Sequence, residues 1–127
     1  MTDNKRTVKG ARLAGLVVAV LGGLAVVSFA KSLTVYNTNN TTKQLSGSDC
    51  ISANCKSFTV ASHGTSTQQV VEPSSGTATL IARFALSSST SVVVASCSSS
   101  FSVATSSFAL VNVNSSSNTY NCAVQVY

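Results

Sequence analysis

Ionisable side chains are scarce in this sequence. Its 127 residues include eight Lys or Arg, three Asp or Glu, one His and no Trp. Half of the basic residues lie within the first twelve positions, so that four basic and two acidic residues follow residue 30, without any run of like charge. Nucleic-acid binding domains typically carry a basic patch or stripe. The lack of one argues against a nucleic-acid partner.

Groups that could carry out chemistry are equally few. General acid–base catalysis needs positioned side chains with tunable pKa values, and beyond residue 30 the candidates are His63, Asp49 and Glu72. Each precedes a residue typical of a turn or tight loop, which predicts that all three are solvated. The sequence contains no nucleophile elbow, phosphate loop, dinucleotide fingerprint or calcium loop. We therefore expect no catalytic residues, no cofactor and no small-molecule substrate, and we do not expect an enzyme.

One long stretch has no charge at all. Leu13 to Ala30 reads LAGLVVAVLGGLAVVSFA. As a helix it would span roughly 27 Å, close to the roughly 30 Å of a bilayer's hydrocarbon core. Residues 1–12 are basic, and basic flanks stay on the cytoplasmic side. The pattern predicts a cytoplasmic N-terminus, a transmembrane or signal helix over residues 13–30, and an extracytoplasmic domain over residues 31–127.

Two fates of this segment remain open. Ser28 to Ala30 offers the small side chains of a signal-peptidase site, and cleavage there would release a secreted domain that begins at Lys31. Small residues also recur every fourth position and would line one helical face, which favours a retained helix that packs closely against another. These helix-packing residues are Ala11, Gly15, Ala19 and Gly23.

The N-terminal region also carries a family resemblance. Val8-Lys9-Gly10-Ala11, followed by the apolar run and a Ser/Thr-rich β region, resembles an archaeal type IV pilin precursor. The resemblance covers the first 30 residues and the general character of the remainder. It implies processing between Gly10 and Ala11 and assembly into a filament. The sequence differs from that pattern at Arg12, where an apolar residue is expected, and its apolar stretch is short for a filament core; we do not assign the chain to that family.

Apolar and polar residues alternate along much of residues 31–127, as is typical of strands that cover a core on one side. The alternation is clearest in Thr77–Leu86 and Tyr120–Val126. Seven or eight such runs, separated by turn signals and without a helical period, predict a mainly β fold, an antiparallel β-sandwich.

Two local predictions follow from turn chemistry. Pro73 to Gly76 is a turn sequence, and we expect an antiparallel hairpin that pairs Gln69–Glu72 with Thr77–Leu80. Asn37 to Asp49 is rich in turn-forming residues and has no periodicity, so we expect an exposed loop there.

Four cysteines, an even number in an exported domain, favour disulfides. Three pairings are possible, and we prefer Cys50 with Cys55 and Cys97 with Cys122, because the two later cysteines fall on the apolar sides of their strands. A zinc site completed by His63 or Asp49 is the competing interpretation. The cysteine spacing fits a closed tetrahedral site poorly, so we expect no metal.

Three asparagines lie in N-glycosylation sequons, namely Asn39, Asn40 and Asn114. They are possible glycan acceptors if the host modifies this domain.

Two classes of function fit these features. The first is a non-enzymatic structural protein, a membrane-tethered β domain that joins further copies or other structural subunits in a cell-surface filament or a membrane-containing virion shell. The alternative is a secreted or surface-displayed binding or adhesion module for a glycan or receptor. We expect the membrane partner to be reached through Leu13 to Ala30.

Overall fold

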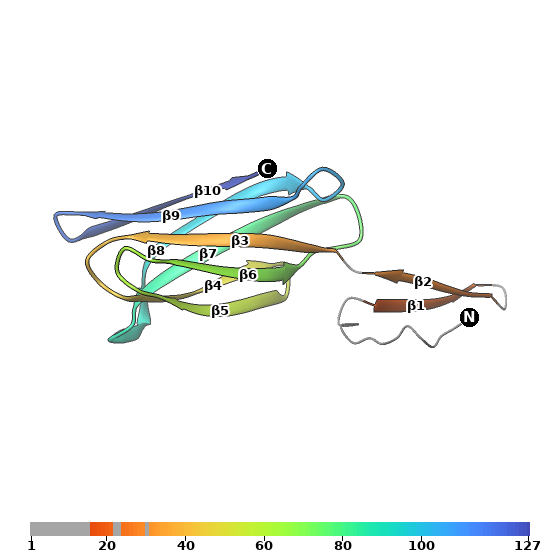
Figure 1. Cartoon of the computed structure of the whole chain (residues 1–127), viewed down its shortest axis with the longest axis horizontal. Helices are drawn as coiled ribbons and strands as arrows, with labels where there is room; N and C mark the ends of the chain where they lie inside the picture. The colour runs from red at the N-terminus through yellow and green to blue at the C-terminus, as the bar shows by residue number, and fades with distance from the viewer. Residues whose placement is uncertain (1–15, 22–23, 30) are drawn as a thin grey trace.

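Two four-stranded sheets face each other in this protein (Figure 1). The structure, a computed structural model, describes residues 16–21, 24–29 and 31–127, and side chains from Lys31 onward. The first sheet, called the β3 sheet, has the order β10-β9-β3-β6 and contains β3 (Ser32–Asn40), β6 (Thr65–Val71), β9 (Phe108–Ser116) and β10 (Thr119–Val126). The second, called the β4 sheet, has the order β5-β4-β7-β8 and contains β4 (Leu45–Ile51), β5 (Asn54–Val60), β7 (Thr77–Leu86) and β8 (Ser89–Ser102). The prediction of a mainly β sandwich with seven or eight strands is confirmed for residues 31–127, which form eight strands.

Strand β3 occupies an inner position in its sheet although it is the first strand of the sandwich. It pairs antiparallel with β6 and parallel with β9, where Thr34 lies opposite Phe108. A purely antiparallel fold was expected, so this pairing corrects the prediction. Parallel neighbours need a crossover connection, and here the strands from β4 to β8 provide it.

The inward faces of the two sheets form one hydrophobic core. Phe84 of β7 is fully buried and packs edge to face against Phe58 of β5, with ring centroids 5.5 Å apart. Gly47 is the strand partner of both residues, and a Cβ atom there would stand 2.1 Å from the Arg83 carbonyl oxygen and 2.8 Å from the Phe58 ring. The absence of a side chain at residue 47 therefore allows the close approach of the β7 backbone and of the Phe58 ring.

The prediction of an exposed loop from Asn37 to Asp49 is wrong for most of these residues. Strand β3 continues to Asn40 and β4 begins at Leu45. The inward-facing positions of these strands include polar residues that are fully buried, Asn37, Asn39 and Asp49. Because a strand is recognised by apolar residues at alternate positions, polar residues on the inner face hid the period.

The hairpin expected across Pro73 to Gly76 is also wrong. The turn exists, and Gly76 has φ +88°. It nevertheless connects β6 to β7, which belong to different sheets. Turn residues predict a change of chain direction, but they do not determine which strands pair afterwards.

The helix predicted over Leu13 to Ala30 is not confirmed. The described residues of this stretch form β1 (Leu16–Leu21) and β2 (Leu24–Phe29), an antiparallel pair that joins neither sheet of the sandwich. A short apolar run is compatible with either a strand or a helix, so periodicity could not decide between them. Among the described residues, no helix is long and apolar enough to cross a membrane.

The predicted helix-packing face is not tested by these strands. Ala11, Gly15 and Gly23 lie outside the described residues, as does the basic region 1–12, and Ala19 lies in β1.

Both predicted disulfides are confirmed. Cys50 and Cys55 face each other on neighbouring strands β4 and β5, with Cα atoms 4.1 Å apart. Cys97 of β8 is bonded to Cys122 of β10, with Cα atoms 5.7 Å apart. Since β8 and β10 are edge strands of opposite sheets, the second disulfide joins the two layers of the sandwich along one side.

We expect the two disulfides to differ in their effect on stability. In the chain-entropy model, a bridge with a sequence separation of 25 residues stabilises by about 3–4 kcal/mol. A separation of 5 residues gives about 2 kcal/mol in the same model. Denaturant unfolding should therefore show a larger loss for Cys97→Ser/Cys122→Ser than for the matched variant Cys50→Ser/Cys55→Ser. The reverse order would contradict the assigned role of the inter-sheet bridge.

Candidate functional site

The three sequon asparagines lie in different environments. Asn39 is fully buried, and its Nδ2 donates to the Lys43 carbonyl oxygen at 2.8 Å while its Oδ1 accepts from the Thr41 amide at 2.9 Å. An N-linked glycan is attached through Nδ2, so Asn39 is not accessible as a glycan acceptor in this fold. Asn40 and Asn114 are exposed and lie opposite each other on β3 and β9. Glycosylation at these two residues stays a prediction.

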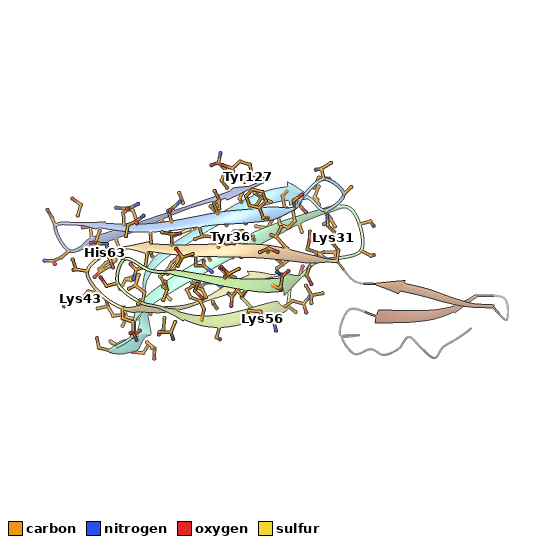
Figure 2. All side chains as sticks on the ribbon, in the orientation of Figure 1. Lys31, Tyr36, Lys43, Lys56, His63 and Tyr127 are labelled. Carbon is orange, nitrogen blue, oxygen red and sulfur yellow. A yellow bond between two sulfur atoms is a disulfide. The ribbon has the colours of Figure 1, made fainter. Side chains whose placement is uncertain are left out.

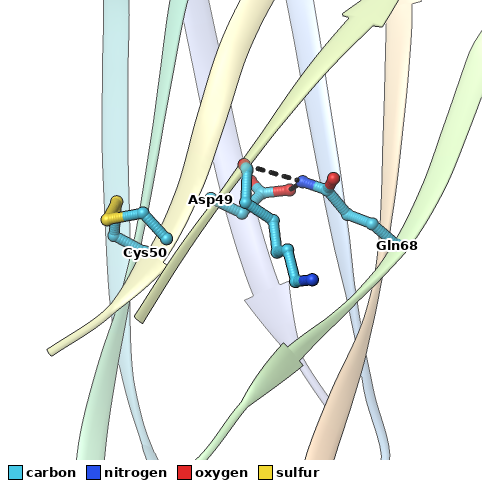
Figure 3. Close-up of a disulfide and its surroundings, with 5 residues drawn as sticks. Asp49, Cys50 and Gln68 are labelled. Carbon is cyan, nitrogen blue, oxygen red and sulfur yellow. Dashed lines mark hydrogen bonds between the residues drawn. A yellow bond between two sulfur atoms is a disulfide. The ribbon is translucent and has the colours of Figure 1, made fainter. Parts of the chain in front are cut away.

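A cluster of polar side chains crosses the core between the sheets. Asp49 of β4 is fully buried, although a solvated turn residue was expected. From the opposite sheet, Asn37 Nδ2 donates to Asp49 Oδ2 at 2.5 Å, and Gln68 Nε2 donates to the same oxygen. Figure 3 shows Gln68 reaching toward Asp49 beside the disulfide of Cys50. The sandwich is thus joined by hydrogen bonds as well as by apolar packing.

Two oxygen atoms of this cluster have no hydrogen-bond partner. They are Asp49 Oδ1 and Asn37 Oδ1, both buried. Burial raises the pKa of Asp49, and the hydrogen bonds from Asn37 and Gln68 lower it by less. The raised pKa shifts the carboxyl group toward its protonated form, in which it can donate as well as accept.

A second polar cluster lies where the chain enters β3. Lys31 Nζ donates to the carbonyl oxygens of Val103 and Ser106, the latter at 2.7 Å. The Lys31 carbonyl oxygen accepts from the Glu72 amide at 2.8 Å. The Ser106 hydroxyl donates to Glu72 Oε1 at 2.9 Å. Figure 2 shows Lys31 at the start of β3. The first residue after the apolar stretch is therefore held by contacts from the β6–β7 loop and the β8–β9 loop.

The sequence predicted that Glu72 and His63 are both solvated turn residues. Glu72 is 3% exposed, so its expected solvation is wrong. The reason is that Pro73 begins a crossing between the sheets, which directs the Glu72 side chain toward Ser106. His63 is exposed in a turn with φ +57°, as expected.

Lys31 Nζ is 3.4 Å from the Ser106 hydroxyl, a pairing that resembles a nucleophile and its base. Ser106 is only 6% exposed, however, and its hydroxyl proton is directed at Glu72. In the part of the chain that the structure describes, no three His, Cys, Asp or Glu residues lie close enough to hold a metal ion.

The outer face of the β4 sheet carries an open groove of about 670 Å³. Small hydroxyl side chains, apolar side chains and one cation line it. The polar lining includes Ser46, Ser48, Ser57, Thr59 and Arg83, and the apolar lining includes Phe58, Phe84, Ala85 and Val93. The sequence pattern gave no sign of this groove, because its residues come from four strands and none belongs to a motif.

No protein-family model, curated protein or solved structure matches this chain.

We expect the Asp49→Asn substitution to remove a pH dependence of stability. Because the pKa of Asp49 is raised from its ordinary 3.8, folding favours the protonated form. Its stabilising contribution is complete below about pH 4 and is lost as the pH rises through the raised value. Asparagine does not titrate, and its amide replaces the unpartnered Oδ1 with a donor. Denaturant unfolding at a series of pH values should show a flatter profile for the variant, with stability at pH 7 equal to or about 1 kcal/mol above that of the original protein.

A loss of more than 1 kcal/mol at pH 7 would contradict this account, especially if the stability of the original protein rose between pH 4 and 7. Lys43→Gln, a change at an exposed residue that precedes β4, is the matched control and should leave the profile unchanged; Lys56 is unsuitable because it lies directly opposite Asp49.

Proposed function

We propose that this protein is a non-enzymatic, membrane-tethered structural subunit. Its β-sandwich takes a place beside further copies or other subunits in an ordered array outside the cytoplasm. A cell-surface filament and a virion shell built over a membrane are the two arrays that this description fits. The proposal rests chiefly on how the sandwich is attached to the apolar stretch.

The sandwich begins directly after the apolar stretch. Strand β3 begins at Ser32, directly after Lys31, and the Lys31 side chain and backbone are both engaged in hydrogen bonds. A domain displayed for independent binding gains reach from a polar, flexible linker. A subunit of an array instead needs one repeated orientation, because closed or helical symmetry places the same surfaces in contact in every copy. The fixed start of β3 favours the second case.

The apolar stretch is proposed to be helical when it lies in a bilayer. An isolated pair of strands such as β1 and β2 is marginally stable in water and leaves backbone groups unpaired along its outer edges. Hydrocarbon offers those groups no partner, whereas a helix satisfies them within the segment. A helical Leu13 to Ala30 is therefore the form compatible with a membrane.

The two disulfides support a location outside the cytoplasm. Disulfides form and persist in oxidising compartments and are rare in the cytosol. All four cysteines are paired, and both bridges lie after the apolar stretch. This agrees with the orientation that the basic N-terminal residues predict.

A secreted or surface-displayed binding module is the second candidate. The groove beside Arg83 favours it, and so does the small-residue sequence at Ser28 to Ala30. Cleavage after Ala30 would leave Lys31 as the first residue, still held by Val103 and Ser106.

A linker insertion tests the structural proposal. Ten Gly and Ser residues placed between Ala30 and Lys31 should leave the fold and membrane insertion intact but free the domain to rotate. We expect the fraction of protein recovered in large particles by ultracentrifugation to fall at least tenfold. The same linker added after Tyr127, which is exposed, should have no such effect. Normal assembly with the inserted linker would contradict the proposal.

The small-residue face gives a second test. Gly15→Leu together with Gly23→Leu keeps the segment apolar but prevents close approach of another helix. Membrane insertion should persist while recovery in large particles falls severalfold, with Leu16→Ile/Leu24→Ile as the matched control. An unchanged particle fraction would exclude helix packing as a contributor.

A further inference from the structure

The described surface of the sandwich presents basic side chains and no acidic side chain. Asp49 and Glu72 are the acidic residues of residues 31–127, and both are buried. Lys43, Lys56 and Arg83 are exposed, and Figure 2 shows the two lysines on the surface of the sandwich. An uncompensated set of exposed cations attracts anionic partners. Arg83 lies in the groove on the outer face of the β4 sheet, and Lys43 borders a smaller hollow of about 500 Å³.

The strand registers place Arg83 in a row of short side chains. Ser57, Ser48, Arg83 and Ser96 are successive partners across β5, β4, β7 and β8. Serine neighbours are too short to cover a guanidinium group, and Arg83 makes no side-chain hydrogen bond or ion pair with any residue the structure describes. Its five N–H donors are therefore available to a ligand.

The next row supplies further hydroxyl groups and an apolar side chain. Thr59, Ser46, Ala85 and Val93 are successive partners on the same face. Ser46 is hydrogen-bonded to Ser87 at 2.8 Å, which holds its hydroxyl in place. Val93 is 53% exposed and offers an apolar surface to the C–H groups of a ligand.

The chemistry of this groove selects one class of ligand. A guanidinium group binds carboxylates through two parallel hydrogen bonds, and serine and threonine hydroxyls both donate to and accept from other hydroxyls. The volume of about 670 Å³ lies within the range of roughly 300–1,000 Å³ usual for small-molecule sites. A carboxylated sugar combines the anion, the hydroxyls and the C–H face that these residues complement.

We propose that the groove formed by Ser46, Ser48, Ser57, Thr59, Arg83 and Val93 binds a carboxylated saccharide, with Arg83 holding the carboxylate. The site is independent of the proposed membrane tether, because every residue in it belongs to the β4 sheet. It would serve a structural subunit as a contact with an acidic polysaccharide layer, and it would serve a secreted module as its binding site.

Titration calorimetry on the full chain in detergent micelles tests this proposal. The probe is a hexamer of galacturonic acid, and the matched ligand is the same hexamer with its carboxylates methyl-esterified. We expect the hexamer to bind with a dissociation constant of about 1 mM or tighter, and the ester to bind at least tenfold more weakly. Arg83→Gln should weaken binding of the acid at least tenfold, whereas Lys56→Gln should change it less than twofold.

A second variant guards against an indirect effect of removing Arg83. Ser48→Glu places a carboxylate directly opposite Arg83 on the neighbouring strand. This carboxylate would form an ion pair with the guanidinium group, so binding of the hexamer should fall tenfold although Arg83 is still present. Equal binding of acid and ester, unchanged binding by Arg83→Gln, or equal losses for Arg83→Gln and Lys56→Gln would each overturn the proposal. So would the absence of binding at millimolar hexamer. Inorganic phosphate that competes as well as the hexamer would show a general anion site and would also overturn it.

Discussion

The parallel pairing of β3 with β9 is the constraint on which the rest of the structure depends. It places the first strand of the sandwich inside its sheet, with β6 on its other side. Strand β3 pairs with β6 from Ser32 and with β9 from Thr34, and Lys31 adds hydrogen bonds to Val103 and Ser106. An edge strand at this position could separate from its sheet without disturbing the core. An inner strand cannot, so any force on the apolar stretch is carried directly into the sandwich.

Hydrogen bonds and a disulfide, in addition to apolar packing, hold the two sheets together. Asp49, Asn37 and Gln68 form a hydrogen-bonded bridge between the sheets, and Cys97–Cys122 joins them covalently at one side. Buried polar groups cost free energy unless they are hydrogen-bonded, and two oxygens of the bridge lack partners. Such groups contribute to the specificity of sheet alignment, since a shifted register would leave more of them unpaired. Burial of Asp49 and Glu72 also leaves no acidic side chain on the surface of residues 31–127, and the anionic ligand proposed for the groove rests on this.

Much of the fold could be predicted from alternating residues, and the failures have physical causes. Strands β7 and β10 carry apolar residues at alternate positions and were recognised. Cys97 and Cys122 were paired correctly because both fall on apolar faces. Strand β4 was missed because its inner face includes Gly47 and Asp49, and the partner of β6 was missed because sheet membership depends on contacts distant in sequence. The groove around Arg83 could not be predicted, since its residues become neighbours only through the registers of four strands.

The central claim is that the apolar stretch stays attached to a sandwich that holds its first residue rigidly. Mass spectrometry of the intact protein from its natural source tests this claim most directly. The account predicts a chain that retains Leu13 to Ala30, beginning at Met1 or, if it is processed like the pilin precursors it resembles, at Ala11. A native chain that begins at Lys31 would contradict it, because the domain would then have no membrane segment to hold.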